Sequence, residues 1–309
     1  MAVVLERPEH LVLSRLDLSE PTSDDVVVDI EWSGISTGTE KLLWSGRMPA
    51  FPGMGYPLVP GYESVGRVSA AGSSSGRRVG DSVFVPGSNC FGPVRGLFGG
   101  AAQRLVVPGA RAMQIDAQLA ERGVLFALAA TAYHANSAPG TQQPDLIVGH
   151  GVLGRMIARL AVAAGAAPVV WETNASRRAG AVGYEVVDPS TDTRRNYRCI
   201  CDVSGDGTLL DALIGRLAPG GEVVLAGFYD APLSFVFPPA FMREARIRVA
   251  AQWQPQDLVA VKEMAESGRL SLDGLITHQH DAMQADLAYR TAFGDPACLK
   301  MILDWRACS

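Results

Sequence analysis

The sequence predicts an α/β protein with two domains, an N-terminal β domain and a doubly wound parallel-sheet domain. Three observations favour this fold class. Residues 1–121 carry short strand patterns separated by turns, residues 122–254 alternate apolar strand and helix patterns, and residues 255–309 return to short mixed elements. Because strands that alternate with helices form βαβ units, the middle stretch is expected to build the parallel sheet. The last stretch is too short for a third domain and is expected to complete the first.

Composition indicates a soluble globular protein with a substantial core. The 309 residues are 48% hydrophobic and 19% charged, with a net charge of −5. This charge argues against nucleic acid as a partner, because phosphate binding needs clustered Lys and Arg. No apolar run reaches the roughly 18–20 residues of a membrane span, and no charged leader precedes the first strand. We therefore expect no integral membrane segment and no signal peptide.

The five cysteines suit a reducing compartment and a cytoplasmic location, since none are in C-x-x-C spacing. Cys199 and Cys201 share one face of a predicted strand. Buried thiols are expected there, because free Cys packs as a small hydrophobe.

The elements of the first domain follow from alternating apolar residues between turn signals. The expected strands are 2–6, 10–17, 25–33, 63–70, 82–86 and 103–108. In the second domain, apolar runs alternate with helical patterns. Strands are expected at 146–148, 168–172, 185–187, 199–203, 222–226 and 247–251, and helices at 120–136, 152–165, 174–181 and 208–217.

The clearest motif is the hexapeptide Gly149-His150-Gly151-Val152-Leu153-Gly154, between the strand 146–148 and a helix. In this G-x-G-x-x-G pattern Gly149 permits a tight turn, Gly151 lets a pyrophosphate approach the backbone, and Gly154 lets the helix pack on the strand. The free amides and positive dipole end of the helix favour phosphate. We expect all six residues to bind a dinucleotide, with the His150 side chain pointing outward.

Glu172 indicates which dinucleotide binds. It ends the second strand at about the ~20-residue separation expected of the acid that accepts hydrogen bonds from ribose hydroxyls. Such an acid repels a 2′-phosphate and favours NAD. The alternative is that Arg177 and Arg178 bind that phosphate, unless they form the exposed face of the next helix. Further cofactor contacts are expected at strand ends, from Thr173, Asn174, Ser204, Gly205, Gly227 and Phe228.

Several motifs resemble the medium-chain dehydrogenase/reductase superfamily. They lie at 34–36, 59–66, 79–83, 149–154 and 217–227. The resemblance implies a GroES-like catalytic domain at 1–121, a Rossmann NAD-binding domain at 122–254 and a C-terminal return at 255–309. It places Lys300 near the pyrophosphate, the alternative being a solvated lysine. It also implies a homodimer paired through the edge strand 247–251.

The resemblance to zinc alcohol dehydrogenases of this superfamily implies that the metal is missing. Ser36 stands where they have a ligand Cys, and Tyr62 stands where they have a ligand His, so that only Glu63 of that set remains. The segment 86–100, where a structural-zinc lobe would lie, offers only Cys90. Zinc prefers Cys and His at tetrahedral spacing. We therefore expect no metal.

Oxidation of an alcohol without zinc needs side chains that take up the hydroxyl proton and stabilise the developing charge. In the resemblance, Thr37 and Thr39 are alternatives for a hydroxyl relay, and Tyr62 either donates a hydrogen bond or packs the strand start. Glu63 orients these hydroxyl groups, a role that Glu40 could also have, or it is a hydrogen-bond acceptor with a purely structural role. His134 either reaches the substrate cleft or the cofactor ribose, or it lies near a helix end with its hydrogen bonds made to structural partners. The candidate catalytic residues are Thr37, Thr39, Tyr62, Glu63 and His134.

A narrower set of segments is similar to a family of dehydrogenases of bacteriochlorophyll biosynthesis. They lie at 32–43, 51–63, 96–100, 170–174 and 238–246. This family oxidises the 3-(1-hydroxyethyl) group of a chlorin to 3-acetyl, which implies a tetrapyrrole substrate and docking near photosynthetic membranes. Trp44, Phe51 and Tyr56 belong to a Gly/Pro-rich loop that either lines the pigment cleft or packs on the β domain. The alternatives are a zinc-free NADPH quinone or enone reductase and a non-catalytic dinucleotide-binding assembly factor.

Overall fold

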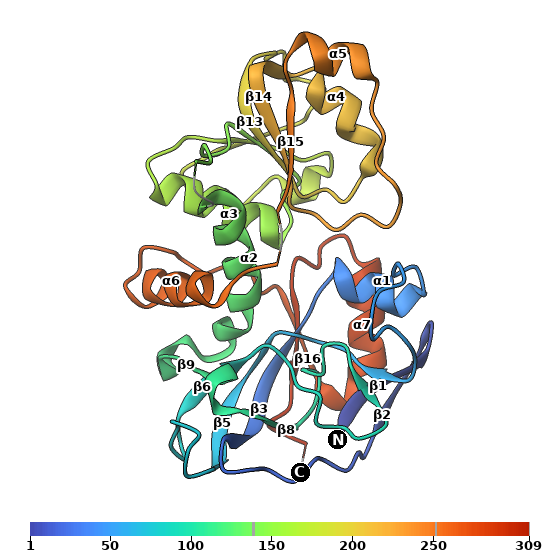
Figure 1. Ribbon diagram of the computed structural model, residues 1–309, viewed down its shortest axis with the longest axis vertical. Coiled ribbons are helices and arrows are strands. Elements are labelled where there is room, and N and C mark those ends of the chain that lie inside the picture. The colour runs from blue at the N-terminus through green and yellow to red at the C-terminus, as the bar shows by residue number, and fades with distance from the viewer. Residues whose placement is uncertain (138–139, 251, 309) are drawn as a thin grey trace. The chain divides into compact units, whose positions relative to one another are not determined.

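The computed structural model describes residues 1–137, 140–250 and 252–308. The chain divides into two compact units, the first formed by Met1–Ala127 with Leu272–Ser309 and the second by Leu128–Ser271. The first carries mixed sheets in which most pairs are antiparallel, and the second carries a parallel sheet, which confirms the predicted fold class (Figure 1). The helix at Pro255–Glu266 belongs to the second unit, so the return to the first unit begins later than residue 255.

The first unit is built around the long strand β3 (Asp25–Ile35). One edge of β3 pairs with β5 (Ser64–Ala71). Its other edge is shared, because β8 pairs with the beginning of β3 and β17, from the end of the chain, pairs with its last residues. The chain end therefore completes the β unit as expected.

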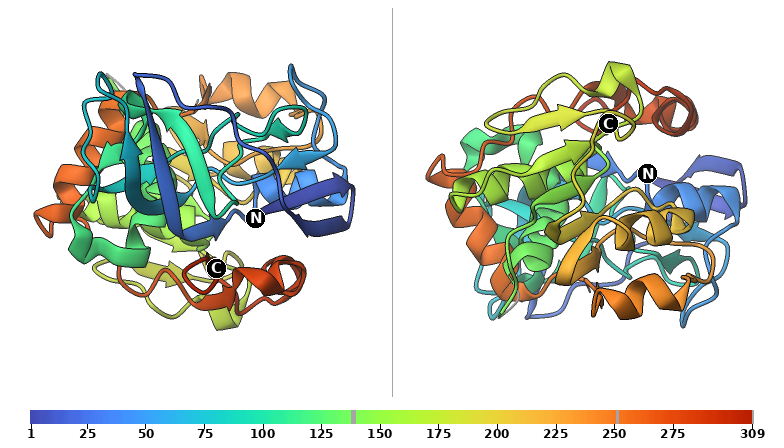
Figure 2. Two further views of the ribbon diagram at one scale, coloured as in Figure 1. Left: turned by 90° about the horizontal axis from the view of Figure 1, so that it is seen from below. Right: turned by 90° about the horizontal axis from the view of Figure 1, so that it is seen from above.

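Two sheets make up this unit, in the orders β16-β17-β3-β5-β6-β9, with β8 added on β3, and β2-β1-β4-β7. The left panel of Figure 2 shows the strands of this unit, seen from below. The remaining strands are β1 (Ala2–Arg7), β2 (His10–Ser14), β4 (Leu58–Val59), β6 (Ser82–Val85), β7 (Arg95–Gly96), β8 (Arg104–Pro108), β9 (Met113–Gln114), β16 (His278–Asp281) and β17 (Met301–Asp304). The helices are α1 (Thr39–Ser45) and α7 (Ala285–Gly294), and a 3₁₀ segment lies between them in the chain at Ala117–Leu125.

The second unit is a six-stranded parallel sheet in the order β12-β11-β10-β13-β14-β15. This is the doubly wound order in which the first strand of the unit lies beside the fourth, and ligands bind where the order reverses. Its strands are β10 (Leu146–Val148), β11 (Val169–Trp171), β12 (Glu185–Val187), β13 (Tyr197–Asp202), β14 (Leu217–Leu225) and β15 (Arg246–Val249).

Helices cover this sheet. Apolar residues of α4 and α5 join the core formed by alternate strand residues such as Leu146 and Ile200. In Figure 1, α3 is drawn to the left of β13–β15, and α4 and α5 to the right. The helices are α2 (Phe126–Ser137), α3 (Val152–Ala163), α4 (Leu210–Ile214), α5 (Phe237–Met242) and α6 (Pro255–Glu266). No helix in the described part of the chain has the length and apolarity that a membrane crossing requires.

Three predicted helices differ in the structure. The helix expected at 174–181 is wrong, since only a 3₁₀ turn forms at Ala175–Arg177. Gly180 and Gly183 have φ of +82° and +80°, a left-handed conformation that ends a helix. The helix expected at 208–217 is shortened to a 3₁₀ turn and α4, and residues 117–125 are 3₁₀ rather than α-helical. The strand expected at 247–251 ends at Val249, and residue 251 lies outside the described residues.

Candidate active site

The glycine loop after β10 fits a dinucleotide. Gly149 has φ of +105°, which a residue with a Cβ adopts only under strain. A Cβ on Gly154 would meet the Gly149 carbonyl oxygen at 1.9 Å, so glycine is required where α3 begins. A Cβ on Gly151 would meet no atom within 4 Å, which leaves open space beside the backbone where a pyrophosphate can lie. Val152 and Leu153 open α3 and contribute N–H groups that no helical carbonyl can accept.

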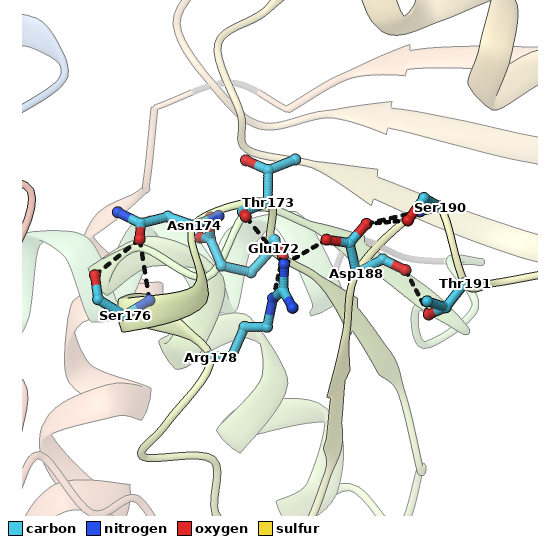
Figure 3. A network of polar contacts seen from close by, with 8 residues as sticks. All are labelled: Glu172, Thr173, Asn174, Ser176, Arg178, Asp188, Ser190 and Thr191. Carbon is cyan, nitrogen blue, oxygen red and sulfur yellow. Dashed lines mark hydrogen bonds and ion pairs between the residues drawn. The ribbon is translucent and has the colours of Figure 1, made fainter.

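Glu172 follows β11 and is tied to this loop. One carboxylate oxygen accepts from the His150 backbone N–H at 3.1 Å, and the other from the Asn174 N–H at 2.8 Å. A carboxylate oxygen has a second lone pair, so both oxygens keep capacity for ribose hydroxyls. Asn174 also caps the turn that follows, where its side chain accepts from Ser176 (Figure 3). Thr173 between them is exposed.

The expectation that the His150 side chain points outward is wrong. The residue is fully buried, with Nδ1 2.6 Å from the Arg177 carbonyl oxygen and Nε2 2.8 Å from the Tyr184 hydroxyl. Because a carbonyl only accepts, Nδ1 carries the proton and Nε2 accepts from Tyr184. Burial lowers the pKa of His150, which keeps the ring neutral. Arg155 of α3 donates to the carbonyls of His150, Arg177 and Ala179.

One of these contacts disfavours a helix after β11. The Arg155 guanidinium and the His150 ring take the Arg177 carbonyl, which in a helix over 174–181 would accept from the N–H of residue 181. The segment is thereby held against the phosphate loop.

Two more strand ends reach the same edge of the sheet. A Cβ on Gly149 would lie 3.5 Å from Ser204 Cα, and a Cβ on Gly227 would lie 3.2 Å from the Gly205 nitrogen. The loops after β10, β13 and β14 therefore lie side by side. This proximity is needed if all three loops are to contact one cofactor. Asp202 fixes the second loop by accepting from the Ser204 N–H at 2.9 Å, and it also accepts from the Tyr229 hydroxyl. Phe228 is 49% exposed.

In the first unit, strand register brings the zinc-position residues together. Ser33 of β3 pairs with Ser64 of β5, so Ser36, just after β3, lies near Tyr62, just before β5. The Tyr62 hydroxyl donates to Ser36 Oγ at 2.6 Å, and the Thr39 side chain also hydrogen-bonds that hydroxyl. Burial and the neighbouring Glu63 carboxylate raise the pKa of Tyr62 far above neutrality. Thr37 is exposed, whereas Thr39 is half-buried at the start of α1.

This donor set does not fit zinc. Zinc in proteins is held by Cys, His, Asp or Glu, and the two ligand positions carry hydroxyls that are hydrogen-bonded to each other. Across residues 1–137, 140–250 and 252–308, no group of three or more His, Cys, Asp or Glu side chains is arranged to hold a metal. All five cysteines are free and buried, and Cys199 and Cys201 lie in β13 as predicted.

Glu63 forms a buried ion pair with Lys300. Lys300 immediately precedes β17, whose first residue pairs with Ile35 of β3, and this register delivers the ammonium to Glu63. Both residues are at most 1% exposed, so the alternative of a solvated lysine is wrong. A Cβ on Gly34 would lie 2.1 Å from Glu63 Oε2, so glycine makes room for the pair.

A second buried carboxyl lies directly behind Ser36. Glu40 accepts from the Ser36 backbone N–H at 3.0 Å and from the Tyr289 hydroxyl of α7 at 2.7 Å. Burial raises the pKa of Glu40 to about 7, although the Tyr289 and Ser36 hydrogen bonds oppose this shift. Glu40 therefore fixes the loop that carries Ser36.

His134 belongs to the second unit, on α2. Its Nδ1 lies 2.8 Å from Asp257 Oδ2 of α6, and Asp257 also accepts from the Gln254 N–H at the start of that helix. The structure thus gives His134 a partner within its own unit. The aromatic side chains of the 44–61 loop, including Phe51 and Tyr56, pack on the core of the first unit.

Sequence reasoning missed four side chains that hold these sites. Arg155 sits in an apolar stretch of α3, a signal that its charge has buried partners. Asp188 begins an Asp-Pro-Ser-Thr turn, which is a pattern for side-chain to backbone hydrogen bonds. Tyr289 and Asp202 carry no local signal, because their partners are distant along the chain or depend on sheet register.

Comparisons with known proteins agree with this fold. Residues 22–117 match the alcohol dehydrogenase GroES-like domain. The 2-desacetyl-2-hydroxyethyl bacteriochlorophyllide A dehydrogenase of Cereibacter sphaeroides is 61% identical, over 99% of this chain and 98% of its own. The enzyme of the same name from Rhodobacter capsulatus is 58% identical, over 98% of both chains. An Escherichia coli alcohol dehydrogenase solved with NADH superposes with a TM-score of 0.83 at 20% identity, over 98% of both chains, and shows the same fold.

The β unit with its GroES-like domain and the doubly wound sheet define a medium-chain dehydrogenase, an oxidoreductase of the alcohol dehydrogenase type. Within that class, the chain belongs to the family of 2-desacetyl-2-hydroxyethyl bacteriochlorophyllide A dehydrogenases.

Proposed function

We propose that this chain oxidises the 3-(1-hydroxyethyl) group of a bacteriochlorophyllide precursor to 3-acetyl, with NAD as cofactor and without zinc. The names of its relatives at 61% and 58% identity support the substrate. The observation that carries the zinc-free mechanism is the hydrogen bond between Tyr62 and Ser36, at the two positions where zinc relatives have ligands.

The bound nicotinamide would accept the hydride from the alcohol carbon. The residues of this chain must then orient the substrate hydroxyl and take its proton. Tyr62 stays protonated near neutral pH because its pKa is raised, so it serves as a hydrogen-bonding relay and not as a phenolate base. The Tyr62, Ser36 and Thr39 hydroxyls relay the proton from the substrate hydroxyl to water, and each gives up one proton as it takes one, so that none of them becomes charged. Of the two alternatives for the relay, Thr39 is favoured, because it hydrogen-bonds Tyr62 and Thr37 is exposed.

Glu63 and Lys300 act through this cluster. Glu63 is fully buried and paired with Lys300, so its charge is compensated and it positions Tyr62, its chain neighbour, instead of serving as the base. In this proposal Lys300 supports the catalytic cluster, and its expected pyrophosphate contact remains a prediction. We assign His134 no step in the proton transfer, because Asp257 already holds its ring. A contact of His134 with the cofactor ribose stays a prediction.

The preference for NAD rests on Glu172. Its carboxylate is fixed by two backbone N–H groups at the end of β11, where an acid accepts the ribose hydroxyls of NAD and repels the 2′-phosphate of NADP. The remaining cofactor contacts would come from the three adjacent loops at the carboxyl edge of the sheet.

We also propose a cytoplasmic homodimer that docks near pigment-bearing membranes. β15 is an edge strand of the sheet. Val249 on it and Phe241 and Met242 on α5 are 66–75% exposed, which is a large apolar area for a free surface. Light scattering should give a dimer, and Val249→Lys with Phe241→Ser should give a monomer. A monomeric wild type would contradict this part.

The direct test incubates purified protein with NAD and the 3-(1-hydroxyethyl) pigment. Formation of the conjugated acetyl group shifts the pigment absorbance while NADH appears. Turnover with NADPH and a quinone or enone instead would favour the reductase alternative. Dinucleotide binding with no turnover on either substrate would favour the assembly factor.

A further inference from the structure

Two arginines follow Glu172, and one of them, Arg178, is held in a particular way. Its Nε donates to the Glu172 carbonyl at 2.8 Å and its Nη2 to the Thr173 carbonyl at 3.0 Å. The same Nη2 also pairs with Asp188 Oδ2. Figure 3 shows the guanidinium between the Glu172 backbone and the Asp188 carboxylate. A cation that could serve a phosphate therefore lies beside the Glu172 backbone and is already paired.

The position of Asp188 follows from strand register. Trp171 of β11 pairs with Val187 of β12, and the Glu172 N–H donates to the Val187 carbonyl at 3.0 Å. The residues directly after the two strands, Glu172 and Asp188, are consequently neighbours at the carboxyl edge of the sheet. Two acidic residues thus follow the two strands at the corner where an adenosine ribose would bind.

Asp188 is held in place independently of the arginine. Its Oδ1 accepts from the Ser190 N–H at 2.9 Å and from Ser190 Oγ at 2.6 Å, and its carbonyl accepts from Thr191 Oγ1 at 2.8 Å. The other oxygen, Oδ2, is left to the guanidinium. The carboxylate is thus a fixed anchor, to which the longer and more flexible arginine side chain is drawn.

We propose that Asp188 is a second determinant of cofactor choice, because it holds the Arg178 guanidinium and withholds that charge from the 2′-phosphate of NADP. Arginine is a strong partner for phosphate, since its planar fork of N–H donors matches phosphate oxygens. Glu172 repels the 2′-phosphate directly, and Asp188 removes the cation that would offset that repulsion. This inference rests on the proposed use of NAD.

The test compares binding of NADH and NADPH by nucleotide fluorescence, together with 2′,5′-ADP and 5′-ADP by calorimetry. The variants are Asp188→Asn, Glu172→Ser and the double variant. Asp188→Asn keeps the size and an acceptor for Ser190 while removing the charge. We expect it to tighten NADPH about threefold relative to NADH, as expected for one partly exposed charge.

The double variant is expected to exceed the product of the single effects by about tenfold, because the released arginine then meets no opposing carboxylate. Adding Arg178→Gln to the double variant should abolish the gain. The proposal would be overturned if the effects of the two single variants on NADPH affinity simply added in the double variant. It would also be overturned if the gain in NADPH affinity survived the addition of Arg178→Gln.

Asp25→Asn is the matched control. Asp25 is an aspartate of the first unit that accepts from the Thr22 N–H and hydroxyl as Asp188 does from Ser190, and its variant should keep the wild-type NADPH/NADH ratio. If Asp188→Asn unfolds the protein, the single variant Arg178→Gln tests the proposal instead. Because Asp188 already holds Arg178, loss of this arginine should leave NADPH affinity within about twofold of the wild-type value. A larger fall would mean that Arg178 already binds the phosphate, and the proposal would be wrong.

The same titrations separate this inference from the proposed function. A wild type that binds NADH tightly and NADPH weakly, with an unchanged ratio in Asp188→Asn, contradicts the inference alone. A wild type that binds neither dinucleotide, or prefers NADPH, contradicts the proposed NAD chemistry and the inference with it.

Discussion

The nucleotide loop of the second unit and the hydroxyl cluster of the first unit are built in different ways. The loop is made of backbone, with glycines where a Cβ would collide with a carbonyl or fill the space for a phosphate. The cluster is made of side chains from the residues just after β3, just before β5 and just before β17, and from α1 and α7. A backbone site is encoded locally, whereas a side-chain site depends on strand register and on residues more than 200 positions apart. The difference predicts how each site responds to substitution.

The largest effect is expected in the hydroxyl cluster. Tyr62→Phe removes the hydroxyl that hydrogen-bonds Ser36 and Thr39, and we expect kcat to fall about 10²- to 10⁴-fold, the contribution typical of a positioned proton-transfer group. NADH affinity should stay unchanged, because the nucleotide loop is untouched. Tyr197→Phe is the control, since it also deletes a buried tyrosine hydrogen bond, to Asp192, but at the amino end of β13. Equal activity losses in both variants would remove Tyr62 from the mechanism.

The next effect is on stability. Lys300→Met leaves the fully buried Glu63 without its cation, and the free energy of unfolding should fall by about 3–5 kcal/mol. Urea denaturation measures this loss, and adding Glu63→Gln should recover part of it. The control is Lys262→Met, which breaks the partly exposed pair with Glu266 and should cost about 0.5 kcal/mol or less. A similar small loss for both lysines would show that the buried pair does not support the cluster.

A pair of glycine variants tests the nucleotide loop. Gly151→Ala adds a methyl group in open space, so stability should hold while NADH affinity falls about tenfold through contact with the pyrophosphate. Gly154→Ala places its methyl group 1.9 Å from the Gly149 oxygen, so stability and NADH affinity should both fall. Thermal denaturation and NADH titration separate the two outcomes. If Gly151→Ala binds NADH as the wild type does, the dinucleotide does not approach this backbone.

The smallest effect is a change in how stability depends on pH. The pKa of Glu40 is raised to about 7 in the folded chain from an ordinary value near 4.5. The folded state therefore holds the proton more tightly, and this contribution to stability is present below about pH 4.5 and lost as the pH rises through about 7. Glu40→Gln imitates the protonated form and should be more stable than wild type above pH 7, with the difference shrinking toward pH 5. A constant difference across this range would contradict the raised pKa.

Sequence reasoning reached the fold because its signals are local. Apolar runs such as 146–148, glycines at fixed spacing and the acid at Glu172 each indicate backbone structure within a short window. The helix expected at 174–181 does not form, because Gly180 is left-handed and because Arg155 and His150, from the preceding βα unit, take the Arg177 carbonyl. The His150 side chain was also expected to point outward. It is buried because its ring contacts the Arg177 carbonyl and the Tyr184 hydroxyl, and no local pattern indicates these partners.

For the hydroxyl cluster, the sequence indicated candidate positions but not how their side chains are connected. Ser36 and Tyr62 could be named from their motifs, yet their hydrogen bond depends on the pairing of β3 with β5. Lys300 joins Glu63 only because β17 pairs with the end of β3. Such partners are fixed by tertiary structure and have no local pattern.

The most direct test of the hydroxyl cluster in place of zinc is metal analysis combined with chelation of the active enzyme. Protein purified without added metal should contain well under one zinc per chain, and pigment oxidation by NAD should continue at an unchanged rate after exhaustive chelation. Stoichiometric zinc, with complete loss of activity on chelation and recovery when zinc is restored, would contradict the account.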